Sequence, residues 1–117
     1  SIPNMKESEI VIAVFPQADG TLKRRPALIL REMPPFRDFL ICGISTQLRR
    51  EVKGFDEIIS RTDKDFSASG LDSDSLIRLG FLLVLPRHQI VGSIGEISAE
   101  RNQRLLKNLS DYLTKSS

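Results

Sequence analysis

The stretch VIAVFPQADGTLKRRPALIL, residues 11–30, decides the fold, because two apolar runs in it flank a polar and basic turn. Both runs are rich in β-branched and aliphatic residues, which favours buried strands, and the Asp-Gly pair at 19–20 is a strong turn signal. We therefore predict a hairpin that carries the basic residues 23–25 at its rim. Pro26 disfavours helical backbone at Arg25, so this guanidinium is expected to leave an extended strand start in a restricted direction, which suits a phosphate.

The chain on either side of this hairpin is predicted to be mostly strand until its C-terminal segment. Alternation and turn signals predict strands near residues 9–16, 25–33, 38–47, 55–60, 75–79, 81–85 and 90–94. Residues 62–74 are rich in Ser, Asp and Gly, which indicates a loop, with one helical turn expected at 63–67.

A single amphipathic helix is expected to end the chain. Ser98 can cap it, and Glu100 falls in its first turn. Five apolar or aromatic side chains share one face at helical spacing and are predicted to be core: Leu105, Leu106, Leu109, Tyr112 and Leu113. Short strands, tight turns and one such helix predict a mostly β fold, a small and strongly curved barrel with the helix on one side or end.

Length and charge narrow the class of protein. A chain of 117 residues makes one domain, which we place at 5–117, and residues 1–4 precede Met5, a natural start, so they are left out of the fold. Residues 23–53 hold eight Lys or Arg against three acidic residues, although the whole chain carries only +2. No run is long enough to span a bilayer and no signal peptide is visible, so an anionic partner is favoured over a membrane. A solvated charged face is the alternative.

The residues that usually carry metal or nucleophilic chemistry are scarce. Cys42 is the only cysteine, so an intramolecular disulfide is impossible, and a buried thiol in a reducing cytoplasm is expected. His88 is the only histidine and follows Pro86-Arg87 in a predicted turn, which favours a surface position. The carboxylates between residues 63 and 74 do not follow an EF-hand pattern, and no zinc spacing exists. We predict neither a metal site nor a cofactor.

Several motifs recur in an order that matches one known family. They are FP at 15–16, KRRPALIL at 23–30, ICGISTQ at 41–47, DF at 65–66, SGL at 69–71, SLIRL at 75–79 and IGEIS at 94–98. Over about residues 9–110 the chain resembles the MazF/PemK toxins of bacterial toxin-antitoxin pairs. The resemblance implies an SH3-like barrel, shared with the CcdB toxins, that forms a two-fold homodimer.

The resemblance also implies a function. The expected activity is that of a type II toxin, an mRNA interferase that cleaves single-stranded RNA at a short sequence without a metal and arrests growth. Attack by the 2′-hydroxyl would leave a 2′,3′-cyclic phosphate and a 5′-hydroxyl. A cognate antitoxin would neutralise the toxin, and DNA would be contacted only indirectly, through the toxin-antitoxin complex.

Site residues are carried over from the matching motifs. Arg25 occupies the place of the family's catalytic arginine, and Ser45 stands where relatives carry Thr or Ser. Residues expected to bind RNA are Lys23, Arg24, Thr46, Gln47, Arg49, Arg50 and Lys53. Each of these two residues also has a structural alternative. Arg25 could serve only as a residue at a strand edge, and Ser45 could serve only to cap the turn at 46–49. Among the aromatic residues, only Phe36 beside Pro34-Pro35 looks free to stack on a base.

Two departures from the family pattern keep other functions open. The first loop lacks the glutamate that many relatives carry before the arginine, and residues 80–83 (GFLL) are more apolar than usual. The alternatives are a CcdB-like poison that traps DNA gyrase on the same barrel, and a non-catalytic module that binds nucleic acid or protein. The pairing of Arg25 with Ser45 argues against the gyrase poison, whereas the apolar stretch keeps the binding module open.

Overall fold

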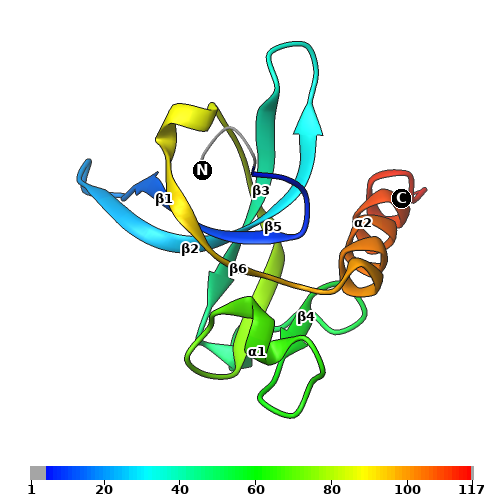
Figure 1. Cartoon of the computed structure of the whole chain (residues 1–117). Coiled ribbons are helices and arrows are strands. Elements are labelled where there is room, and N and C mark those ends of the chain that lie inside the picture. Colours follow the sequence, from blue (N-terminus) through cyan, green and yellow to red (C-terminus); the bar gives the residue numbers. More distant parts are fainter. Residues whose placement is uncertain (1–4, 117) are drawn as a thin grey trace.

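The computed structural model describes residues 5–116, so the segment 1–4, expected to precede the natural start, lies outside the described residues. The elements are β1 (Glu9–Pro16), β2 (Leu22–Met33), β3 (Asp38–Ser45), η2 (Leu48–Arg50), β4 (Glu57–Ile59), α1 (Phe66–Ser69), β5 (Ser75–Leu85), η3 (Arg87–Gln89), β6 (Ile90–Glu96) and α2 (Ala99–Leu113). Figure 1 shows the strands wrapped into a curled sheet with α2 at one side. Among these described helices, none has the length and apolar character needed to cross a membrane.

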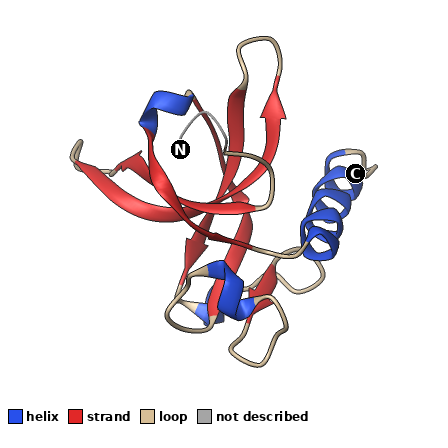
Figure 2. Cartoon of the chain, in the orientation of Figure 1, coloured by secondary structure: helices blue, strands red, loops and turns tan. Residues whose placement is uncertain are grey.

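Figure 2 shows the strands in red. Within residues 5–116 they form one antiparallel sheet of six strands, in the order β4-β5-β3-β2-β1-β6. The predicted strand at 9–16 is confirmed to the residue, and the predicted hairpin pairs Ala13 with Arg25. Two predictions are wrong in detail. The segments 75–79 and 81–85 form one continuous strand, because Gly80 sits in an irregularity of β5 and does not end it. The short helix begins at Phe66, and not at residue 63.

Side chains that alternate along the strands fill two apolar clusters. Leu28 and Leu30 of β2 enter one cluster, and Ala27 and Ile29 enter the other. Because successive side chains point to opposite faces of a strand, this division places one cluster on each face of the sheet. Leu105 and Leu109 of α2 belong to the first cluster, so the helix covers that face.

The α1 segment packs tightly on the edge strand β6. A Cβ on Gly95 would clash with the backbone carbonyl of Ala68, and a Cβ on Gly70 would clash with the carbonyl of Ile94. Gly70 also has a φ of +75°, a conformation that glycine adopts without strain. The loop between β4 and β5 therefore reaches β6, at the far edge of the sheet from β4.

The C-terminal helix begins as predicted, but its apolar face is only partly core. Ser98 Oγ accepts a hydrogen bond from the Arg101 backbone N–H at 3.1 Å and caps α2. The prediction that the whole apolar face is buried is wrong at its end, since Tyr112 is 59% exposed and Leu113 is 69% exposed. Figure 1 shows why: the C-terminal end of α2 stands away from the strands.

Candidate functional site

A pocket of about 450 Å³ opens where the β1–β2 loop, β2, the end of β3 and β5 meet. It is lined by Phe15, Pro16, Gln17, Ala18, Arg25, Pro26, Ile44, Ser45, Thr46, Gln47, Arg50, Arg78 and Phe81. The basic residues 23–25, predicted to lie at the turn, are paired residues of β2, because this strand begins at Leu22 and only residues 17–21 form the turn. The pairing of β2 with β3, in which Ala27 lies opposite Gly43, brings them and the ISTQ segment to the same end of the sheet.

The hairpin loop is held by its own hydrogen bonds. Thr21 donates to Asp19 Oδ1 from its hydroxyl at 2.6 Å and from its backbone N–H at 3.0 Å, which lowers the pKa of Asp19. The Gln17 backbone N–H donates to the Thr21 carbonyl at 2.7 Å. Gly20, with a φ of +87°, takes the left-handed turn position that its place in the sequence predicts. The strand that carries Arg25 is therefore anchored at its start.

Three arginines face this pocket without a carboxylate among the lining residues. They are Arg25 from β2, Arg50 from η2 and Arg78 from β5. Within residues 5–116, none of the three side chains makes a hydrogen bond or an ion pair. Unneutralised guanidinium groups in one hollow favour an anion with several oxygens, since the planar fork of donors matches a phosphate.

Ser45 lies at the end of β3 and shares the pocket with Arg25. Its Oγ accepts a hydrogen bond from the Gln47 backbone N–H at 3.0 Å. Ser45 therefore does cap the turn that follows β3, as the structural alternative predicts. A hydroxyl that accepts this bond still has its own proton to donate. Ser45 can therefore support the turn and donate to a ligand oxygen at the same time.

Only part of the expected RNA-binding set meets at the pocket. Thr46, Gln47 and Arg50 line it, whereas Lys23, Arg24 and Arg49 are exposed but do not line it. Lys53 lies at a different hollow, of about 350 Å³, beside Phe55 and Tyr112 of the α2 end.

Sequence reasoning missed two lining residues of β5, Arg78 and Phe81. The arginine that follows the buried Leu76 and Ile77 was a usable signal, because two consecutive buried residues place both faces of the strand in the core, where charged residues are rare. Phe81 is 38% exposed, and nothing in the sequence pattern separates it from the core phenylalanines.

A second hollow, of about 320 Å³, shares part of its lining with the first. It shares Pro26, Ile44, Ser45 and Thr46 with the arginine pocket, and its far side includes Asp72 and Ser73 of the loop before β5. Ser45 thus lines both hollows.

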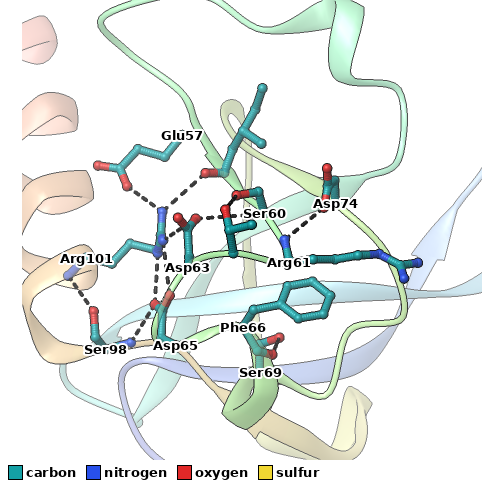
Figure 3. A network of polar contacts seen from close by, with 12 residues as sticks. Glu57, Ser60, Arg61, Asp63, Asp65, Phe66, Ser69, Asp74, Ser98 and Arg101 are labelled. Carbon is teal, nitrogen blue, oxygen red and sulfur yellow. Dashed lines mark hydrogen bonds and ion pairs between the residues drawn. The ribbon is translucent and has the colours of Figure 1, made fainter.

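A partly buried network of charges fixes α2 to β4 and to the loop that follows it. Figure 3 shows Arg101 reaching from α2 toward three carboxylates: Asp65 at 2.9 Å, Asp63 at 3.0 Å and Glu57 at 2.8 Å. The Arg101 guanidinium, which donates to Asp65, is the largest cause that lowers the pKa of Asp65 to about 2. A cation in the first turn of a helix is unfavourable unless it is paired, which was the sequence signal for this network.

Cys42 and His88 take no part in the pocket. Cys42 is buried, as predicted, and burial raises the pKa of its thiol. His88 is exposed in η3, in the predicted turn. Within the described part of the chain, no group of three His, Cys, Asp or Glu could hold a metal ion.

Comparisons with known proteins agree on one family. The model of the PemK-like, MazF-like toxins of type II toxin-antitoxin systems matches residues 6–113. Among solved structures, the chain is similar to the Mycobacterium tuberculosis toxin MazF-mt6, with a TM-score of 0.65 and 20% identity over 93% of this chain and 99% of that one. That likeness shows a MazF-like fold. No curated protein matches the chain. Because the family model covers nearly all of the described residues, the chain belongs to the PemK-like, MazF-like toxins of type II toxin-antitoxin systems.

Proposed function

We propose that this toxin is a metal-independent endoribonuclease that cleaves single-stranded RNA at a short sequence. The observation that carries the proposal is the convergence of Arg25, Arg50 and Arg78 on one pocket, with Ser45 beside them. No carboxylate in the part of the chain that the structure describes lines this pocket. Family membership supports the same activity, since toxins of this family are typically endoribonucleases.

The chemistry uses a nucleophile that the substrate brings with it. The ribose 2′-hydroxyl loses its proton and its oxygen attacks the adjacent phosphorus, while the bond from phosphorus to the 5′-oxygen breaks and that oxygen takes up a proton. The products are a 2′,3′-cyclic phosphate and a 5′-hydroxyl. Arg25 and Arg78 would stabilise the charge that develops on the phosphate oxygens, and Ser45 would donate to one of them. Among the described residues 5–116, neither a carboxylate nor a histidine lines the pocket, so we assign proton transfer to solvent and catalysis chiefly to charge stabilisation.

The exposed cations outside the pocket have a separate role in this proposal. Lys23, Arg24 and Arg49 would attract the RNA backbone along the rim, and Thr46 and Gln47 would contact the nucleotide at the scissile phosphate. A type II toxin implies a cognate antitoxin, and we propose that an acidic segment of it lies over the three arginines.

We further propose that the curled sheet acts as an SH3-like barrel and that two chains form a homodimer. Leu82 and Leu83 of the apolar segment 80–83 are half-buried, so the exposed apolar surface that a second copy would cover lies instead at the end of α2. Tyr112, Leu113 and Val52 are each more than half exposed there, and a second copy would cover them. Light scattering at micromolar concentration should give the mass of two chains, and a one-chain mass would contradict the dimer.

The activity is tested with purified protein, freed of antitoxin, in excess EDTA. It should cut a mixed-sequence single-stranded RNA and leave the cyclic phosphate and the 5′-hydroxyl described above. Deoxyribose at the cleavage position should abolish cutting and leave binding largely intact, because the phosphate contacts persist. Cleavage of the deoxy strand, or a strict need for magnesium, would show the mechanism to be wrong. Inhibition of gyrase without any RNA cleavage would favour the binding poison in its place.

A further inference from the structure

The strand β5 contains an irregularity beside the arginine pocket. Gly43 of β3 pairs with Arg78, but the preceding residue, Cys42, pairs with Leu82. Residues 79–81 of β5 therefore have no pairing partner on β3. Such a bulge redirects side chains away from the regular alternation of the strand. Here it places Phe81 at the pocket that Arg78 also lines.

The Phe81 ring is held by two contacts from neighbouring strands. It lies over Gly43, where an added Cβ would be 2.7 Å from a ring carbon. It also packs against the buried Phe15 of β1, with ring centroids 5.4 Å apart and an angle of 43° between the planes. Despite these contacts 38% of Phe81 stays exposed. The ring is therefore fixed in place and still accessible from the pocket.

We propose that Phe81 is the stacking surface for the nucleobase next to the phosphate that the arginines hold. The inference rests on the proposed function and adds a binding site for a flat aromatic group to it. A fixed ring beside three guanidinium groups offers both parts that single-stranded nucleic acid needs, a cationic track for the phosphates and an aromatic face for a base. Because every base has a π-face, stacking positions the chain without selecting its sequence.

This assignment replaces the expectation that Phe36 stacks on a base. Phe36 is 81% exposed, but it lies in the turn between β2 and β3 and does not line the arginine pocket. The assignment also gives a role to the apolar GFLL segment at 80–83, which departs from the family pattern.

The chain contains no tryptophan, so Phe81→Trp supplies a single fluorescent reporter at the site. The probe is a short mixed-sequence DNA strand, which this mechanism cannot cleave. Adding it should quench the introduced tryptophan, whereas the same strand without bases should bind through its phosphates and leave the emission nearly unchanged. Phe36→Trp is the matched control, and its emission should not respond to either strand.

A second variant separates stacking from packing. Phe81→Leu retains an apolar side chain on Phe15, so the melting temperature should change little, while KM for RNA should rise roughly tenfold, the order expected for losing one stacked base. Phe81→Tyr should restore KM. Binding of the strand that depends on Arg25 but does not quench the reporter would overturn the stacking and leave the endoribonuclease proposal intact.

Two further outcomes count against the inference. If neither RNA nor DNA binds, the proposed function fails first and the stacking site fails with it. If the reporter responds to protein concentration and not to the strand, the ring belongs to a contact between copies of the chain, and the stacking assignment is wrong.

Discussion

Asp56 Oδ1 accepts a hydrogen bond from the backbone N–H of Leu79 at 3.0 Å, which joins the loop before β4 to the irregular part of β5. Its other oxygen accepts from the Val52 backbone N–H at 2.8 Å. Leu79 has no pairing partner on β3, so Asp56 satisfies a buried donor that the sheet leaves free. The side chain that supports the bulge thus also supports the placement of Arg78 and Phe81.

We predict that Asp56→Ala destabilises the protein by about 1–3 kcal/mol, because it leaves the Leu79 N–H buried without an acceptor. Chemical denaturation measures this loss. Asp72→Ala removes the same charge from an exposed side chain and should change stability little. Equal stability of the two variants would mean that the contact with Leu79 contributes nothing.

The close approach of α1 to β6 gives a second prediction. Gly95→Ala should lower the melting temperature clearly, because the new Cβ would meet the Ala68 carbonyl and force α1 away from the strand. Gly92→Ala on the same strand is the control, since nothing lies within 4 Å of its added Cβ. If Gly95→Ala and Gly92→Ala had the same melting temperature, α1 would move away from β6 without any loss of stability, which would contradict the prediction.

The sequence predicted those parts of the fold that depend on local pattern. The strand at 9–16 alternates clearly and ends at a strong turn, and both of its bounds were predicted correctly. The hairpin and the pairing of β2 with β3 then bring Arg25 and Ser45 to one pocket. The bulge at 79–81 could not be predicted, because it depends on Asp56, an acceptor distant in sequence, and Gly80 alone resembles a strand break.

The charge network at α2 escaped the sequence analysis for a similar reason. The carboxylates of Asp63 and Asp65 were considered only as metal ligands, and their actual partner, Arg101, lies on the terminal helix. Its guanidinium is 8% exposed, and burying it requires all three carboxylates to be in place. The position of Arg101 in the first turn of α2 indicates that it needs an acidic partner, but only tertiary packing specifies which carboxylates meet it.

Acid should weaken this network within a defined range. The pKa of Asp65 is lowered from 3.8 to about 2, so its stabilising effect is complete above pH 3.8 and disappears as the pH falls through about 2. The shift corresponds to about 2 kcal/mol. The pKa of Asp63 is lowered too, first by the Ser60 N–H, and it adds to the same decline.

The variant Asp65→Asn tests whether titration of Asp65 causes the loss of stability in acid. It should be less stable than the parent chain at neutral pH and should lose less further stability between pH 4 and pH 2, because the titrating group is gone. Denaturant midpoints at several pH values measure both effects. Parallel pH profiles for the two proteins would place the acid sensitivity elsewhere.

The last prediction distinguishes specific phosphate binding in the pocket from non-specific attraction of RNA by the positive charge of the protein. Arg25→Ala should reduce RNA cleavage by roughly 100-fold or more, the order expected for losing a key electrostatic donor, and Arg78→Ala should cause a loss of the same order. Arg24→Ala removes an equal charge from the adjacent residue, which does not line the pocket, so its effect should be several-fold at most and should fade with added salt. Circular dichroism and melting temperature of Arg25→Ala should match the parent, because its side chain is exposed and makes no ion pair within residues 5–116. Full cleavage by Arg25→Ala, or equal losses at Arg24 and Arg25, would show that the pocket does not hold the scissile phosphate.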